Sequence, residues 1–119
     1  MNQQIKLHER IEGPAVVSIA DIREILTRTY RDAVIFGWEN RQIKNMTQAT
    51  LAERTGMRPS HLADYLAKGD TDEKGRARRD MPAKYIPDFE RAVGNTFVSQ
   101  WLAMKSQLTI LEAMIAAQE

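Results

Sequence analysis

The chain has 119 residues, a formal net charge of +1, no cysteine and two histidines. Its length suits one domain with a hydrophobic core of its own. The lack of cysteine excludes disulfides and thiolate metal sites and suits a reducing, cytoplasmic setting. His8 and His61 have no ligand-like spacing to carboxylates, and no apolar run approaches the roughly 18 residues that span a bilayer. We therefore expect neither a metal nor a membrane partner.

Positive charge gathers in the middle of the chain. Residues 41–84 contain ten Lys or Arg against six Asp or Glu, a net charge of +4, while the remaining residues sum to −3. A basic segment of this kind is where a polyanion such as DNA would bind. The alternative is an ordinary solvated surface on which the charges cluster by chance.

The N-terminal part predicts an arm followed by a helix. Residues 1–17 show no sustained periodicity, and we expect only a short extended piece at residues 15–17. Ser18 and Asp21 then resemble a capping box. Apolar residues recur at helical spacing beyond them, which predicts one helix over residues 19–39.

The most informative pattern is a pair of short helices, predicted at residues 47–55 and 59–67. Thr47 can cap the first helix through its hydroxyl. Gly56 can take the left-handed conformation that ends a helix in a tight turn, and Pro59 suits the first turn of the next helix. The small or apolar residues expected to hold the pair together are Leu51, Ala52, Met57, Leu62 and Tyr65. This geometry lets a protein place its second helix in the major groove of DNA.

A basic loop and two more helices are expected after this pair. Residues 68–80 are almost without apolar side chains and predict the loop. Pro87 should break or restart the next helix, and Gly94 should end it. Thr96 can then cap the last helix. No strand-like alternation is sustained, so the predicted fold is all-α with five helices.

The last helix is more apolar around its circumference than a surface helix requires. We expect it to join two subunits, since a two-fold homodimer is the commonest assembly. The residues predicted to make this contact are Leu108, Leu111, Met114 and Ile115. The alternative is that this helix closes the core of a monomer. The chain is thus divided into an arm (1–17), a DNA-binding domain (18–95) and an oligomerisation helix (96–119).

The pattern Thr47-Gln48-x-x-Leu51-Ala52-x-x-x-Gly56-Met57, followed by Ser60-x-Leu62-x-x-Tyr65, resembles the lambda-repressor-like (XRE-type) helix-turn-helix family of bacterial and phage regulators. The stretch from Met81 to Ala103 also resembles prophage-encoded DNA-binding regulators. The resemblance implies a lambda-repressor-like fold that binds double-stranded operator DNA as a homodimer, with a phosphate bound by Gln48. The residues it places at DNA are Gln48, Arg58, Pro59, Ser60, His61, Asp64 and Lys68. The loop over residues 68–80 departs from the family because it is longer than the usual connection, and we expect its Arg76, Arg78 and Arg79 to form an added, non-specific phosphate clamp.

The chemistry of several of these side chains suits base reading. Arg58 can bond O6 and N7 of guanine together, Ser60 can bond a base or a phosphate, and Asp64 can accept from N4 of cytosine. A carboxylate near phosphates repels them unless a base donor or a neighbouring Arg pairs with it. Pro59 departs from the family pattern, where a polar residue often stands, so its contact is either lost or apolar.

No motif in the chain indicates catalysis. It lacks a phosphate-binding loop, a histidine beside a nucleophile and a carboxylate, and paired carboxylates in an apolar setting. We expect a non-enzyme without a cofactor or small-molecule ligand. The leading hypothesis is a transcriptional regulator, a repressor or an activator, of phage or prophage type. The rivals are a protein-interaction module, such as an antitoxin or a phage antagonist of a host factor, and an architectural or excisionase-type DNA binder.

Overall fold

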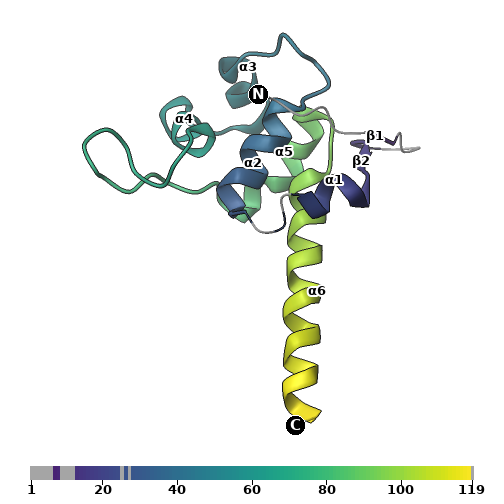
Figure 1. The fold of residues 1–119 in the computed structure, drawn as a ribbon. Helices are drawn as coiled ribbons and strands as arrows, with labels where there is room; N and C mark the ends of the chain where they lie inside the picture. The colour runs from purple at the N-terminus through teal and green to yellow at the C-terminus, as the bar shows by residue number, and fades with distance from the viewer. Residues whose placement is uncertain (1–6, 9–12, 25, 27, 119) are drawn as a thin grey trace.

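Six α-helices lie in the part of the chain that the computed structural model describes, which comprises residues 7–8, 13–24, 26 and 28–118 (Figure 1). They are α1 (Ile19–Glu24), α2 (Tyr30–Glu39), α3 (Gln48–Thr55), α4 (Pro59–Leu66), α5 (Ile86–Val93) and α6 (Phe97–Gln118), with a 3₁₀ turn, η1 (Ala83–Tyr85), before α5. Two strands of two residues each, β1 (Leu7–His8) and β2 (Val16–Val17), pair in antiparallel fashion. The predicted helical class is confirmed.

The prediction of one helix over residues 19–39 is wrong, and with it the count of five helices. Thr29 begins a new helix, α2, because its hydroxyl accepts a hydrogen bond from the Asp32 N–H at 3.2 Å and the Asp32 carboxylate accepts one from the Thr29 N–H at 3.3 Å. This capping box has the same spacing as Ser18 and Asp21. The helical periodicity of the apolar residues continues across the break and hides it.

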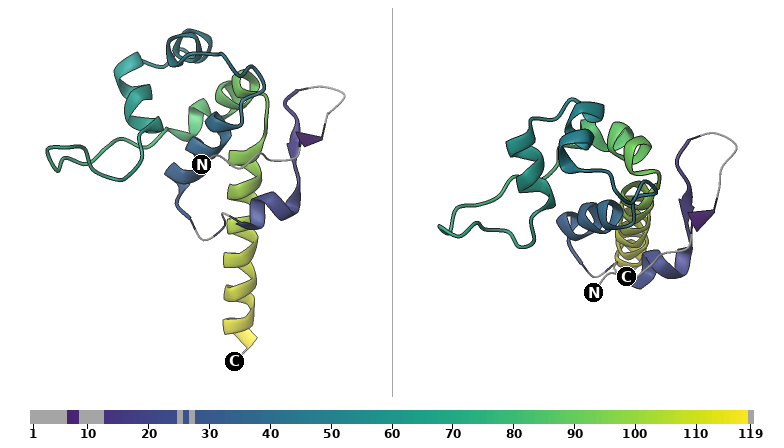
Figure 2. Two further views of the ribbon diagram at one scale, coloured as in Figure 1. Left: turned by 45° about the horizontal axis from the view of Figure 1, so that its top comes forward. Right: turned by 90° about the horizontal axis from the view of Figure 1, so that it is seen from above.

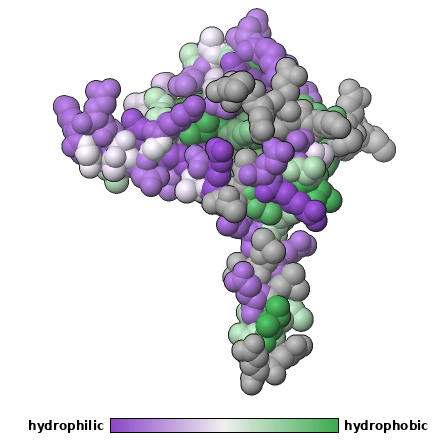
Figure 3. All heavy atoms as spheres, in the orientation of Figure 1, coloured by the Kyte–Doolittle hydropathy of each residue, from purple (hydrophilic) through white to green (hydrophobic). Residues whose placement is uncertain are grey.

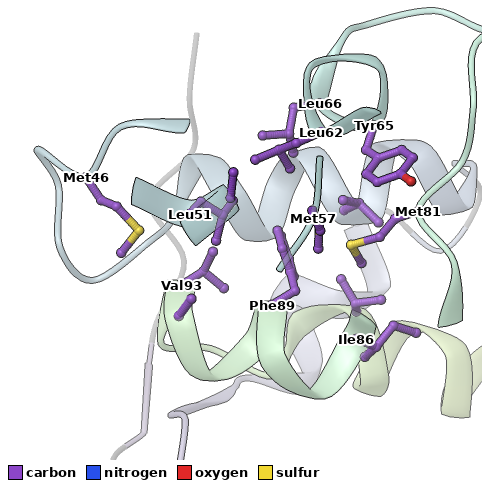
Figure 4. Close-up of a cluster of buried hydrophobic side chains, with 14 residues drawn as sticks. Met46, Leu51, Met57, Leu62, Tyr65, Leu66, Met81, Ile86, Phe89 and Val93 are labelled. Atoms are coloured by element: carbon purple, nitrogen blue, oxygen red, sulfur yellow. The ribbon is translucent and has the colours of Figure 1, made fainter. Parts of the chain in front are cut away.

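The main hydrophobic core lies among α2, α3, α4 and α5. Leu51, Leu62 and Phe89 are fully buried at its centre and come from three different helices (Figure 4). Full burial of side chains of this size contributes about 1.5–3 kcal/mol each. The core therefore holds α3 and α4 firmly on the remaining helices.

A second cluster ties the N-terminal segment to α6. Val17, Ile22, Phe97 and Trp101 are buried there, and the rings of Phe36 and Phe97 lie 4.7 Å apart between centroids. The amide of the Gln100 side chain brackets the backbone of Val17, because it accepts from the Val17 N–H at 2.8 Å and donates to the Val17 carbonyl at 2.7 Å. The end of the predicted arm is thus packed into the body of the protein.

The start of α6 is capped in a way that differs from the prediction. Thr96 does precede the helix, but its hydroxyl donates to the Ala15 carbonyl at 3.3 Å and to Oε1 of Gln100 at 2.8 Å. The buried carboxylate of Glu90 accepts from the N–H of Ser99 at 2.9 Å and from its hydroxyl at 2.6 Å. A side chain of α5 therefore satisfies one N–H of the first turn of α6, and Oδ1 of Asn95 accepts from another, that of Phe97, at 3.2 Å.

Helix α6 leaves the body and projects from it (Figures 1 and 2). Its first turns bury Phe97, Val98 and Trp101, whereas Met114 and Ile115 near its end are 55% and 61% exposed. Leu108 and Leu111 fall in the part of α6 whose side chains lie outside the description. Helices α3 and α4 lie toward the opposite end of the molecule from the C-terminus (Figure 1). Among the helices described, none combines the length and apolar character needed to cross a bilayer.

Candidate nucleic-acid interface

Helices α3 and α4 form the predicted pair, and each local signal for it is confirmed. The Thr47 hydroxyl caps α3 by accepting a hydrogen bond from the Thr50 N–H at 3.2 Å. Gly56 ends α3 with a φ of 75°, in the left-handed region, and its N–H donates to the Ala52 carbonyl at 2.9 Å. Pro59 stands in the first turn of α4, where its missing N–H removes no helical bond. The two helices are joined by a turn of three residues.

Thr55 holds this turn through contacts that the sequence pattern did not indicate. Its buried hydroxyl donates to the Leu51 carbonyl at 2.7 Å and accepts from the Met57 N–H at 3.4 Å. A hydroxyl on a helix commonly bonds to the carbonyl four residues earlier. The position of Thr55, four residues after Leu51 in the helix, is therefore the sequence signal for this hydrogen bond. The prediction of the turn used the apolar positions and did not include it.

The two sides of α4 have opposite environments. Arg58, Pro59 and Ser60 are exposed, and His61 and Asp64 are half-buried at the surface. The core-facing residues of this helix are Leu62, Tyr65 and Leu66, which are all buried (Figure 4). Two further residues predicted to contact DNA, Gln48 in the first turn of α3 and Lys68 beyond α4, are exposed. The residues predicted to touch DNA at the helix pair are thus accessible to a ligand.

The segment before α3 is held by a stacked arginine. The guanidinium of Arg41 lies 4.0 Å from the ring centroid of Trp38. It also donates to the carbonyls of Trp38, Lys44 and Met46 at 3.0, 3.0 and 3.1 Å. These bonds position the segment that leads into Gln48. Arg41 contributes to the positive charge of the region, but its hydrogen bonds serve the fold.

A buried arginine joins α4 to the loop that follows it. Arg31 of α2 is 4% exposed and donates through Nη1 to the carbonyls of Asp64 and, at 3.1 Å, Ala67. Its Nη2 donates to the Arg79 carbonyl at 2.6 Å and lies 3.3 Å from the Asp80 carboxylate. The end of α4 and the returning end of the loop are therefore bound to the same side chain.

The basic loop, residues 68–80, is folded into a hairpin that projects from the body beside α4 (Figure 2). Thr71 and Ala77 bridge in antiparallel fashion across it. The Asp72 carboxylate accepts from the N–H groups of Arg76 and Lys74, each at 2.9 Å. These bonds, that of Arg76 foremost, lower the pKa of the Asp72 carboxyl below its ordinary value. Hydrophilic side chains dominate the surface of this hairpin (Figure 3).

Two of the three arginines predicted to clamp phosphates bind to the hairpin itself. Nε of Arg76 lies 3.0 Å from the Asp72 carboxylate. Arg78 is half-buried and donates through Nη1 to the carbonyls of Lys68 and Gly69. Arg78 therefore stabilises the base of the hairpin, whereas Arg76 is exposed near its tip and can still approach a phosphate.

The third arginine reaches α4. Nη1 of Arg79 lies 3.0 Å from Oδ2 of Asp64, in a hydrogen-bonded ion pair at the surface. Asp64 is the residue whose carboxylate was expected to repel phosphates unless an Arg lay beside it. The structure places that Arg beside it, and it comes from the hairpin rather than from α4.

The exposed groups of this surface are suited to binding. They comprise a guanidinium, a hydroxyl, an imidazole and an amide, which offer hydrogen-bond donors to a ligand rich in acceptors. Among the residues described, no three His, Cys, Asp or Glu side chains lie close enough together to hold a metal ion.

Comparison of the chain with protein-family models, with curated proteins and with solved structures returned no match. An assignment of function therefore depends on the residues of this chain and on their arrangement.

Proposed function

We propose that the chain is a sequence-specific DNA-binding transcriptional regulator of the lambda-repressor-like helix-turn-helix class. The division of α4 into two sides supports this most directly. Leu62 and Tyr65 anchor the helix in the core, while Arg58 and Ser60 stay exposed beyond the left-handed turn at Gly56. A short helix with one free polar side fits the major groove, which is about 12 Å wide.

The N-terminal end of α4 would enter the groove and read bases. Arg58 can donate two hydrogen bonds to O6 and N7 of a guanine, and Ser60 and His61 can bond neighbouring base edges. Gln48 would bond a backbone phosphate from the first turn of α3. Phosphate contacts carry no sequence information, but they set the register in which a helix meets the bases.

The surrounding charge would supply affinity for any duplex. Residues 41–84 carry the net charge of +4, and Lys44, Arg54, Lys68 and Arg76 are exposed within this range. Each phosphate neutralised by such a side chain releases counterions, so binding weakens as salt rises. We expect the affinity for specific and unrelated duplexes alike to fall steeply between low and physiological salt.

A second copy of the chain would bind through the projecting part of α6. Met114 and Ile115 are exposed there, hydrophobic residues are visible near its C-terminal end (Figure 3), and residues 106–118 contain Glu112 as their one charged residue. Two α6 helices that run parallel would leave both helix pairs at the same end of the dimer. Two half-sites about 34–36 Å apart could then be read together.

Selection of bound duplexes from a random pool tests the proposed function. The expected result is a palindromic consensus, since a symmetric dimer reads its half-sites in opposite directions. The selection should be run at low salt, where electrostatic binding is strongest. Recovery of an unenriched pool, or failure to retain any duplex, would contradict the proposal.

Replacement Arg58→Ala tests the base contact. We expect the preference for a guanine at one base pair of each half-site to fall about tenfold, because a good bidentate pair discriminates by about 1–3 kcal/mol. Gel-shift titrations against duplexes altered at each position measure this. Arg23→Ala is the matched control, since it removes the same charge from an exposed position on α1. Equal behaviour of the two variants would reject the role of Arg58.

A further inference from the structure

The ion pair between Asp64 and Arg79 joins the reading side of α4 to the hairpin. The two side chains are 32% and 59% exposed, so the pair lies where a ligand can reach it. Asp64 is the single charged residue of α4. It lies one helical turn beyond Ser60, and residues four apart share a face of a helix. The pair therefore extends the surface that Arg58 and Ser60 begin.

The main chain of Arg79 is held against the same helix. The buried guanidinium of Arg31 donates to the Arg79 carbonyl at 2.6 Å and, through its other nitrogen, to the carbonyl of Asp64. Arg79 is thus fastened at its backbone by Arg31 and at its tip by Asp64. A long side chain that is ordered in this way before binding loses less conformational entropy when it meets its ligand.

This arrangement suits base reading better than phosphate binding. A guanidinium has five N–H donors, and the bond to Asp64 uses one of them. Enough donors remain for the two-pronged contact with O6 and N7 of guanine. A carboxylate partner reduces the net positive charge of the site, which weakens attraction to phosphates in general. Its hydrogen bond to Nη1 also restricts where the guanidinium can lie, which favours a contact of defined geometry.

We propose that Arg79 reads the edge of a guanine in the major groove and that Asp64 is the positioning residue that aims it. This inference depends on the DNA-binding function proposed above and deepens it. It changes Arg79 from a member of a non-specific clamp into a determinant of sequence preference. Arg76, at the outer end of the hairpin, keeps the phosphate role.

A double-mutant cycle tests the inference. The wild-type chain, Asp64→Asn, Arg79→Ala and the double variant are titrated in gel shifts against the selected duplex and against duplexes changed at each base pair. Each single variant should lower the preference for guanine at the same base pair about tenfold. The double variant should lose no more than Arg79→Ala alone, and Asp64→Glu should restore part of the preference.

A second ion pair provides the control. Asp88 and Arg91 of α5 also form an exposed carboxylate–guanidinium pair. Asp88→Asn and Arg91→Ala should leave the preference for every base pair unchanged. Thermal unfolding should give the same midpoint for each Asp64 and Arg79 variant as for the wild-type chain, so a change in preference reports binding and not folding.

Three results with a chain that binds DNA would overturn the inference. A loss that is equal for all sequences in Arg79→Ala would make Arg79 a phosphate contact. Losses that multiply in the double variant would show that Asp64 and Arg79 act independently. Tighter binding of Asp64→Asn to every duplex would show that Asp64 merely repels DNA. Failure of the wild-type chain to select any duplex would instead overturn the proposed function, and this inference with it.

Discussion

Arg31 shows how much of the candidate site depends on one side chain that does not face the ligand. It lies in α2, yet its hydrogen bonds reach carbonyl groups 33 to 48 residues away along the chain. A buried guanidinium is tolerated when its donors and its charge are satisfied. The charge of Arg31 is paired with the carboxylate of Asp80, and its Nη1 and Nη2 donate to the carbonyls of Asp64, Ala67 and Arg79. Its Nε is buried without a hydrogen-bond partner among the described residues. Arg31 thereby sets where the hairpin lies relative to α4.

Replacement Arg31→Met should lower the free energy of unfolding by about 3 kcal/mol. Loss of the guanidinium leaves several carbonyls at the end of α4 without their donor, and breaking a buried charged network typically costs about 3–5 kcal/mol. Urea denaturation measures the change. Arg28→Met is the matched control, because Arg28 is exposed just before α2 and a surface substitution changes stability by only about 0.5 kcal/mol. Equal stability of the two variants would refute the role given to Arg31.

Tyr30 gives the fold a dependence on alkaline pH. Its hydroxyl donates to the Met81 carbonyl at 2.8 Å. Burial, and to a lesser degree the charges of Asp80 and Glu90, raise its pKa from 10.0 to about 12. The folded state therefore holds this proton more tightly than the unfolded state. Its contribution to stability is complete below pH 10 and is lost as the pH rises from 10 to about 12.

Replacement Tyr30→Phe should remove this alkaline sensitivity. At neutral pH the variant should be less stable by about 1 kcal/mol, the net value of one hydrogen bond. The melting temperatures of the wild-type chain and of the variant are measured from pH 8 to pH 12. The difference between the two melting temperatures should shrink at the alkaline end. Parallel curves over the whole range would show that Tyr30 does not titrate differently in the folded state.

At the scale of elements, the helix pair was predictable because its signals act over a few residues. A cap, a left-handed glycine and a proline in the first turn each depend on their nearest neighbours. The boundaries of α3 and α4 consequently agree with the prediction to within one residue at each end. The division between α1 and α2 was not predicted, although Thr29 and Asp32 form an equally local signal. The apolar periodicity runs through both helices and led to the prediction of one helix.

Replacement Gly56→Ala tests the turn between α3 and α4. An added Cβ would meet no atom within 4 Å, so the strain comes from the φ of 75° alone. A side chain in the left-handed region costs about 1–2 kcal/mol, and we expect that loss in urea denaturation together with weaker binding to the selected duplex. Gly56→Asn should lose less of both, because Asn tolerates this conformation. Identical losses in the two variants would refute the explanation by backbone conformation.

At the scale of the whole molecule, α6 has two environments along one helix. Its first turns complete the core through Phe97, Val98 and Trp101, and its last turns carry Met114 and Ile115 into solvent. The expected function of the last helix, joining subunits, and its alternative, closing the core of the monomer, can therefore both have a place on it. Closing the core is shown by the structure, and joining subunits is proposed.

Replacement Ile115→Glu should convert the proposed dimer into a monomer that binds a single half-site weakly. Ile115 is 61% exposed, so a charge there disturbs a partner surface but not the core. Light scattering coupled to size-exclusion chromatography measures the mass. Ala103→Glu adds the same charge at an exposed position of α6 that precedes residues 106–118 and should leave the dimer intact. A wild-type chain that is monomeric at every concentration would contradict the proposed dimer.

Features that depend on neighbouring residues and contacts between distant residues thus have different origins in this protein. The amino-acid sequence by itself determined the helical class, the α3–α4 pair and the apolar side of α4, because capping, turn formation and periodicity depend on residues within about one helical turn. Only the tertiary structure decided which polar and charged groups are partners, as with Arg79 and Asp64, 15 residues apart, or Ser99 and Glu90, nine apart. Such pairs form when the packing of the core brings distant segments together, and no local pattern in the chain encodes that proximity.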